Sequence, residues 1–272
     1  MGISAFSQSQ FHSMSLPMVD GSSRRKSMSS NFNRNEIYAR HAVIPGYLQE
    51  IVFHTTILLI GVGGLGSLIA LLLARKGIGT LLLSDPDRIS VSNLSRQLFS
   101  LSDVGKNKAE CAAVRLKDHC VGGTQLIGSP LSIQELSENP MILPSFDVMI
   151  CAVDNKSARR AALSAGLRAN RPVLFVAVDY TAESFSVSIQ EPGNACFGCM
   201  DLDLDSERVA PCEIPAAIDI NSMAAGLTGY ALDHLLMNTR PVSWNHRRIH
   251  AAGFMPDVSL NVAKNPDCKF CG

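Results

Sequence analysis

Hydrophobic and polar positions alternate in blocks along most of the chain. Residues 55–60 (TTILLI) form a short apolar run, followed by glycines and then by the helix-like stretch 67–77 (SLIALLLARKG). A second apolar run lies at 79–84 (GTLLLS). Short apolar runs bounded by turn residues are typical of buried strands. The pattern predicts a strand, a tight turn, a buried helix and a second strand.

The alternation continues through the middle of the chain. Helical spacing appears at 106–120, where alanine and leucine share one face, and a second helix is predicted at 156–170. Strands are predicted at 146–153 and 171–178, and residues 181–190 have the alternation of an antiparallel strand. This order predicts an α/β fold, a Rossmann-like, mostly parallel sheet with helices on both faces and an antiparallel C-terminal extension.

Polar residues follow three of the predicted strands directly. They are the glycine run GVGGLG at 61–66, Asp85 and Asp154. Ligands of open α/β sheets bind at the carboxyl ends of the strands. We therefore expect these three features to meet at one edge of the sheet.

The glycine run predicts a nucleotide site. Its glycines allow a sharp turn that brings amide groups and a helix N-terminus against phosphate oxygens; they are Gly61, Gly63, Gly64 and Gly66. Asp85, at the end of the next strand, is placed to accept hydrogen bonds from ribose hydroxyls. These features fit NAD, FAD or ATP equally well, so an NAD or FAD oxidoreductase stays open beside an ATP enzyme. A P-loop is excluded because GxxxxGK[ST] does not occur.

The loop SDPDRISVSNLSRQLF at 84–99 carries more polar groups than a dinucleotide needs. Together with GVGGLGS (61–67), DVGKNKAE (103–110), CAVDNKSAR (151–159) and the two CxxC pairs, it resembles the ThiF/MoeB/HesA family of ubiquitin-activating-enzyme-like adenylyltransferases. The resemblance covers residues 36–272 and implies one adenylyltransferase domain there. Residues 1–35, rich in Ser, Asn, Gln and Met, are expected to be a disordered polar tail.

The resemblance implies that a carboxylate attacks the α-phosphate of ATP to give an acyl-adenylate and pyrophosphate. Because both reactants are anions, such catalysis rests on cations and fixed donors. By likeness, Arg96, Gln97 and Lys108 contact the triphosphate, and Asn93 fixes the same loop. Asp154 is the expected Mg²⁺ ligand. For Asp87 two roles stay open, a ribose contact or a local turn that holds the loop.

The segment IYARHAVIPG at 37–46 resembles the part of the family that precedes the first strand. There an arginine reaches the ATP of the other subunit, and Arg40 is the matching position. The alternative is an exposed arginine on a short helix. The family role implies a homodimer.

The cysteines suggest a metal site. Cys196 and Cys199 form one CxxC pair and Cys268 and Cys271 form another, although the interval between the pairs exceeds ordinary zinc-ribbon spacing. The resemblance implies that both pairs hold one structural Zn²⁺.

Cys212 lies in a proline-flanked loop where some family members carry a cysteine that joins covalently to the activated partner. The loop EIPAAIDINSM departs from the family's glycine-rich segment. Two interpretations of Cys212 stay open: a nucleophile that forms the covalent bond, or a loop cysteine with no role in the reaction.

Composition limits the partners. The chain has 24 basic and 24 acidic residues, and this balance argues against a nucleic-acid binder. The apolar stretch 57–74 is interrupted by glycines, so it predicts no membrane span. We find no secretory signal and expect a cytoplasmic protein. The expected partner is a small ubiquitin-like sulfur-carrier protein ending in Gly-Gly, with a ribosomal precursor peptide as the alternative.

Overall fold

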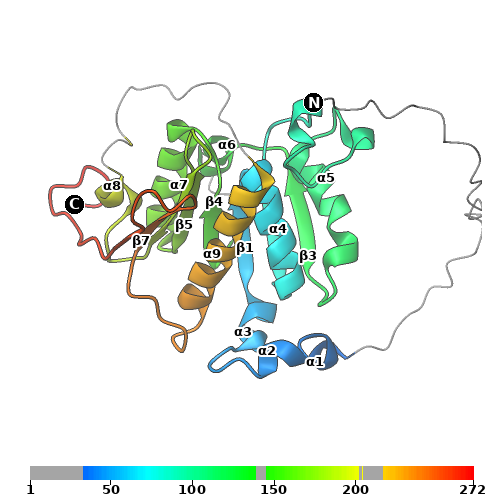
Figure 1. Ribbon diagram of the computed structural model, residues 1–272, viewed down its shortest axis with the longest axis horizontal. Helices are drawn as coiled ribbons and strands as arrows, with labels where there is room; N and C mark the ends of the chain where they lie inside the picture. The colour runs from blue at the N-terminus through cyan, green and yellow to red at the C-terminus, as the bar shows by residue number, and fades with distance from the viewer. Residues whose placement is uncertain (1–32, 139–144, 202–203, 205–216) are drawn as a thin grey trace, which may run out of the picture. The chain divides into compact units, whose positions relative to one another are not determined.

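The computed structural model describes residues 33–138, 145–201, 204 and 217–272 (Figure 1). Cys212 and nearly all of the expected tail lie outside these ranges. The first helix begins at Arg34, close to the expected start of the domain at residue 36.

One sheet of eight strands organises the described residues, in the order β3-β2-β1-β4-β5-β6-β7-β8. The first five strands in this order pair in parallel, and β6, β7 and β8 pair antiparallel to their neighbours. The strands are β1 Thr56–Ile60, β2 Thr80–Ser84, β3 Gln125–Ser129, β4 Val148–Cys151, β5 Val173–Val178, β6 Ser184–Gln190, β7 His246–His250 and β8 Val258–Leu260. The expected mostly parallel sheet with an antiparallel C-terminal extension is confirmed.

Helices cover both faces of the sheet. They are α1 Arg34–Ile37, α2 Ala39–Ala42, α3 Gln49–His54, α4 Gly64–Lys76, α5 Lys108–Arg115, α6 Ile133–Glu138, α7 Lys156–Ala169, α8 Phe197–Met200 and α9 Ile218–Leu236. Alternate residues of the strands feed two separate cores: Leu59 packs with residues of α4, α5 and α9, whereas Leu58 packs with residues of α6 and α7. In Figure 1, α4 and α9 lie side by side on one face of the sheet.

Local sequence explains where the central helices begin and end. Asn107 caps α5 by accepting a hydrogen bond from the Glu110 amide (3.0 Å), so α5 starts at Lys108, two residues later than the pattern suggested. Gly77 ends α4 in the left-handed conformation, which a glycine adopts without strain. The predicted helix 106–120 also stops at Arg115 and continues as a short 3₁₀ turn.

Three strands have no counterpart among the predicted elements. β3 (QLIGS), β7 (HRRIH) and β8 (VSL) lack a continuous apolar run, and none of them contains a fully buried residue. Pairing with β2, β6 and β7, respectively, decides their conformation. Among the described residues, no helix is both long and apolar enough to cross a membrane.

Candidate active site

A cavity of about 700 Å³ opens at the carboxyl ends of the parallel strands. Its volume lies in the usual range for small-molecule sites. Most of the predicted nucleotide residues line it, although up to 93 positions separate them: Gly61, Gly63, Gly64, Asp85, Asp87, Asn93, Arg96, Gln97, Lys108 and Asp154. The expected convergence at one edge of the sheet is therefore present.

The glycine turn joins β1 to α4. Gly61 has φ +86°, a left-handed conformation that side chains other than glycine rarely adopt. A Cβ atom on Gly66 would collide with the Gly61 carbonyl, so the turn and the helix can approach this closely only without side chains. The first helical bond runs from the Ser67 amide to the Gly63 carbonyl. The amides of the first helical residues therefore have no partner within the helix, and Gly64 and Leu65 among them line the cavity, as an anion site requires.

Asp85 ties the glycine turn to β2. Its Oδ2 accepts the Val62 amide (2.6 Å) and its Oδ1 accepts the Asp87 amide (2.9 Å). Burial raises the pKa of this carboxyl, and the charge of Lys108 and the two amide bonds oppose that rise. Asp85 thus fixes the turn, while each of its oxygens keeps a lone pair for a further donor such as a ribose hydroxyl.

Lys108 is the first residue of α5, and its amine enters the cavity beside Asp87. The distance from Lys108 Nζ to Asp87 Oδ2 is 2.8 Å, and only 10% of the lysine side chain is exposed. The side-chain amide of Asn107 donates a hydrogen bond to the backbone carbonyl of Asp85 (2.7 Å). This bond anchors the start of α5 to the loop after β2. The structure thus shows Asp87 as the partner of the lysine.

The polar loop after β2 presents three more side chains. Arg96 donates to the Ser92 carbonyl (2.8 Å), and Asn93 accepts the Ser90 amide (3.1 Å) within a short 3₁₀ turn. Gln97 is 9% exposed, and its Oε1 has no hydrogen-bond partner among the described residues. A buried acceptor without a partner at a cavity wall is a feature that a ligand can satisfy.

Asp154 lies at the turn between β4 and α7. Its side chain is exposed and makes no hydrogen bond or ion pair with another described residue. Its neighbours hold the turn instead: Arg159 donates twice to the Val153 carbonyl (3.1 and 3.0 Å), and Asn155 caps α7 through the Ala158 amide (2.8 Å). The carboxylate is thus positioned by its backbone and left open to the cavity.

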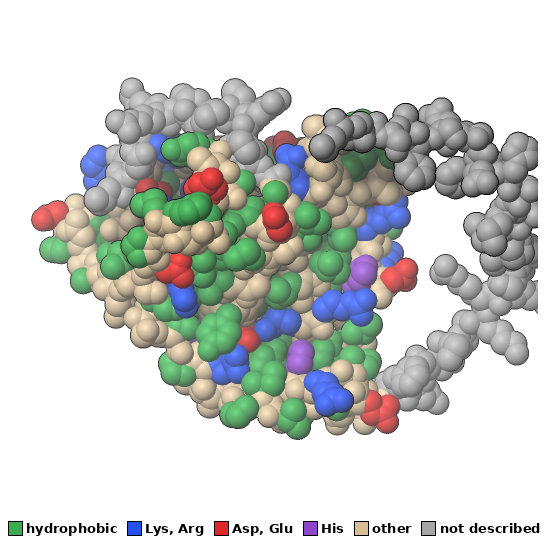
Figure 2. Space-filling view, viewed as in Figure 1, with side chains coloured by type: hydrophobic (Ala, Val, Ile, Leu, Met, Phe, Trp, Pro, Cys, Tyr) green, Lys and Arg blue, Asp and Glu red, His purple; other side chains and the backbone are tan. Residues whose placement is uncertain are grey.

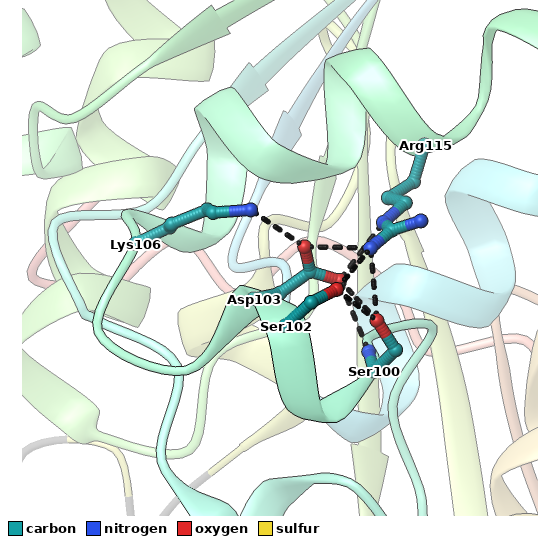
Figure 3. Close-up of polar contacts among 5 residues, drawn as sticks. All are labelled: Ser100, Ser102, Asp103, Lys106 and Arg115. Atoms are coloured by element: carbon teal, nitrogen blue, oxygen red, sulfur yellow. Dashed lines mark hydrogen bonds and ion pairs between the residues drawn. The ribbon is translucent and has the colours of Figure 1, made fainter.

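Sequence reasoning did not single out a polar cluster around Asp103, in the segment between the polar loop after β2 and α5. Asp103 is 1% exposed, and Figure 3 shows its carboxylate between Lys106, Arg115 and Ser100. Arg115 donates to both of its oxygens (2.8 Å each), Lys106 to Oδ1 (3.0 Å), and the Ser100 amide and hydroxyl to Oδ2 (3.0 Å each). The bond from Arg115 holds the pKa of Asp103 well below its usual range. The sequence offers no signal for this, because a turn of Ser, Asp and Lys is typical of a solvated loop.

Arg40 is the one predicted nucleotide contact that lies well away from the cavity of its own chain. It is exposed on α2, close in sequence to α3, which leads into the amino end of β1. The cavity lies at the carboxyl end of the same strand. The other predicted residue that does not line the cavity, Gly66, is buried within α4.

The four paired cysteines come together at α8 and the C-terminus. All four sulfur atoms lie within 4.8 Å of one another, and three of the distances are 3.6, 3.6 and 3.9 Å. Four thiolates placed tetrahedrally at the usual Zn–S length are about 3.8 Å apart. The cluster therefore fits a zinc ion, and none of its cysteines forms a disulfide.

Comparisons with known proteins identify relatives of this chain. Ubiquitin-like modifier-activating enzyme 5 of Caenorhabditis briggsae is 27% identical over 262 residues, which are 88% of this chain and 59% of that protein. The NEDD8-activating enzyme E1 catalytic subunit of Caenorhabditis elegans is 37% identical over 139 residues, 50% of this chain and 32% of that one. The chain thus spans only part of the length of these curated relatives.

Among solved structures, E. coli MccB with AMPCPP and MccA superposes with a TM-score of 0.69 at 25% identity, covering 82% of this chain and 68% of that one. PaaA, at 21% identity, has a TM-score of 0.68, covers 89% of this chain and 87% of that one, and supports the fold alone.

The model of the ThiF family matches residues 36–270, nearly the whole described part of the chain. This match agrees with the resemblance that the glycine run, the loop at 84–99 and the paired cysteines indicated. The chain belongs to the ThiF family.

Proposed function

We propose that the chain is an ATP-dependent adenylyltransferase that activates a carboxylate as an acyl-adenylate. The observation that carries this proposal is that a glycine turn, the cationic side chains of Arg96 and Lys108 and the open carboxylate of Asp154 line the same cavity. Membership of the ThiF family and the likeness to MccB, which was also solved with ATP, support it. An NAD or FAD oxidoreductase would explain the turn and Asp85 but would leave Arg96, Lys108 and Asp154 without a use.

In the proposed reaction an oxygen of the carboxylate forms a bond to the α-phosphorus of ATP. The bond from that phosphorus to the oxygen bridging to the β-phosphate breaks, and pyrophosphate leaves. No proton has to be removed, so the barrier comes from bringing two anions together. Arg96 and Lys108 offset this repulsion, and the free amides at the start of α4 bind phosphate oxygens.

The position of Lys108 suits it to bind phosphate oxygens. Asp87 keeps its amine at the cavity wall, and the side chain is mostly buried, where a charge interacts more strongly than in water. Phosphate oxygens can replace or join the Asp87 oxygen without movement of the helix. Asn93 holds the neighbouring part of the loop, the side-chain amide of Gln97 contacts the triphosphate, and Asp85 binds the ribose while it fixes the turn.

The carboxylate that lines the cavity is of the kind that binds a magnesium ion. Mg²⁺ is usually held by one or two carboxylates together with substrate phosphates, and Asp154 offers an open carboxylate at the cavity. The ion supplies positive charge beside the phosphates when it is bound. The four clustered cysteines would hold Zn²⁺ as a structural ion that joins α8 to the C-terminus.

Two substrates remain in this proposal. One is the C-terminal glycine of a small ubiquitin-like sulfur carrier, supported by the relatives named as activating enzymes of ubiquitin-like modifiers. The other is a ribosomal precursor peptide, supported by the likeness to MccB, which was solved with MccA. Cys212 as a covalent acceptor of the activated acyl group belongs to the first and lies outside the described residues.

We also propose a homodimer in which Arg40 of one subunit reaches the nucleotide of the other. The support is that Arg40 is exposed and far from the cavity of its own chain. In addition, α9 exposes Ile218, Met223 and Tyr230 to between 46% and 51%. Figure 2 shows hydrophobic side chains spread over the face that α4 and α9 form, as a face that pairs with a second copy would have.

ATP–pyrophosphate exchange with Mg²⁺ tests the proposed function. The expected result is exchange that depends on a carrier ending in Gly-Gly or on a precursor peptide encoded nearby. Dependence on one of them names the substrate class. Binding of NAD or FAD in place of ATP, with no exchange, would contradict the proposal.

A further inference from the structure

One buried polar group at the cavity has no role in the mechanism described above. Asn221 lies in the first turn of α9, is 2% exposed and lines the cavity. Its Nδ2 has no hydrogen-bond partner among the residues that the structure describes. Buried amide groups in proteins are nearly always paired, because leaving one unpaired costs free energy. An unpaired donor at a cavity wall therefore points to an acceptor on a ligand.

The surroundings of Asn221 identify the charge of that acceptor. A Cβ atom built on Gly64 would lie 2.9 Å from Asn221 Nδ2 and 3.3 Å from Arg96 Cγ. The amide thus packs against the first residue of α4, beside the side chain of an arginine. The start of α4 carries free amides and the positive end of the helix dipole. Three kinds of positive or donor group meet there, so the acceptor is an anionic oxygen.

The anionic oxygen could belong to a phosphate of ATP or to the carboxylate of the acyl substrate. The position of Asn221 along the sheet favours one of these two sources. The cavity extends from residues after β3 to the end of β5, where Val176 and Val178 line it. Asp85, the predicted ribose contact, follows β2, toward one end of this row. Helix α9 packs on α4, β5 and β6 instead. The helix that carries Asn221 therefore lies toward the end of the row away from Asp85, the end left for an acyl group when a ribose is bound at Asp85.

We propose that Asn221 binds the carboxylate of the acyl substrate. Its amide donates to one carboxylate oxygen while the other oxygen attacks the α-phosphorus, and Asn221 itself is unchanged by the reaction. This inference rests on the proposed function and adds to it the residue that positions the nucleophile. The substrate is accordingly a peptide or protein whose reacting carboxylate is free, neither amidated nor esterified.

Calorimetric titration tests this with defined probes. The protein is saturated with Mg²⁺ and AMPCPP, whose methylene bridge prevents loss of pyrophosphate, and is titrated with triglycine or with triglycine amide. Asn221→Ala removes the amide, and Asn221→Leu removes it at similar volume. Ser222→Ala is the matched control, because Ser222 is the next residue of the same turn but is exposed and bonds only to the Ile218 carbonyl.

The wild-type protein is expected to bind triglycine more tightly than its amide. Both Asn221 variants should weaken triglycine binding about tenfold or more, since a hydrogen bond to a charged group is lost, and should leave AMPCPP affinity within twofold. The Ser222 variant should match the wild type. Asn221→Leu should melt at or above the wild-type temperature, because it removes an unpaired buried group.

Two binding results would overturn the inference. One is triglycine binding that does not differ between wild type and the Asn221 variants or between acid and amide. The other is a tenfold loss of AMPCPP affinity, which would make a phosphate the partner of Asn221. The exchange assay distinguishes the two proposals. If exchange is absent but triglycine binding depends on Asn221, only the proposed function is rejected. If exchange occurs and the KM for the acyl substrate is unchanged in Asn221→Ala, only the role of Asn221 is rejected.

Discussion

Asp103 and Asp154 are both aspartates of polar loops near the same cavity, and they are built in opposite ways. Asp103 is buried, and four donor groups from Ser100, Lys106 and Arg115 make five hydrogen bonds to its oxygens. Asp154 is exposed and has no such partner among the described residues, while Arg159 and Asn155 hold the backbone around it. The protein thus supplies hydrogen-bond donors to both oxygens of Asp103, as a carboxylate that stabilises the fold needs. It leaves the carboxylate of Asp154 free and positions it through the backbone, as the proposed metal ligand needs.

The four cysteines, like Asp154, keep ligand atoms free for a cation, and the chain brings their sulfur atoms together at a spacing suited to one. We expect the largest effect on zinc content and stability from replacing one of these cysteines. The wild type is expected to hold one zinc per chain. Cys268→Ser should lose this zinc, with a loss of folding free energy of roughly 10 kcal/mol, because zinc binding is coupled to folding. Elemental analysis and thermal melting measure both. Cys120→Ser, outside the cluster, should keep its zinc; if Cys268→Ser kept it too, the cluster would not be the site.

Asp154→Ala should abolish most of the adenylation. Loss of the carboxylate that positions the metal and phosphates is expected to lower the exchange rate by about a hundredfold to a thousandfold, the usual effect of removing one electrostatic contact to a transition state. The melting temperature should stay within about 2 °C of wild type, since no protein contact is lost. An exchange rate close to wild type would show that Asp154 is not a metal ligand.

Asp103→Ala should show the reverse pattern. It removes the acceptor of the Ser100 amide and of the Arg115 and Lys106 side chains, so five hydrogen bonds to a buried charge are lost and the free energy of unfolding should fall by about 3 kcal/mol. Urea unfolding at pH 7 measures this, with Asp118→Ala as a control at an exposed aspartate nearby. At temperatures where the variant is folded, its exchange rate should remain within a few-fold of wild type. A hundredfold loss in the folded variant would break the distinction between the two aspartates.

The smallest effect concerns pH. Because the pKa of Asp103 is held well below its usual range by Arg115, the folded protein keeps this carboxylate charged at pH values where the unfolded chain protonates it. The stabilisation is therefore complete above the unfolded pKa of about 4 and is lost progressively as pH falls below it. The difference in unfolding free energy between wild type and Asp103→Asn should be constant from pH 7 to pH 5 and shrink below pH 4. A difference independent of pH down to 3 would contradict this.

The sequence predicted four of the five parallel strands, β1, β2, β4 and β5, because they are continuous apolar runs that are recognisable without any partner. It also predicted that the glycine turn, Asp85 and Asp154 meet, since each follows such a strand and parallel strands end at one edge; Arg96, Gln97 and Lys108 were expected there from the family resemblance. By contrast, β3, β7 and β8 have mixed sequences whose conformation depends on the neighbouring strand. Local pattern carries no information about such pairing.

Sequence alone thus determined the fold class, the glycine turn, the polar loop after β2 and the two cysteine pairs, because each depends on residue types at short spacing. Only the tertiary structure decided that Asp103 is a buried anchor, that Lys108 lies against Asp87, and that Asn221 brings to the cavity an amide nitrogen with no hydrogen-bond partner among the described residues. These roles depend on how completely distant segments satisfy each polar group. Burial and hydrogen-bond partners are properties of the packed chain, and the order of its residues does not show them.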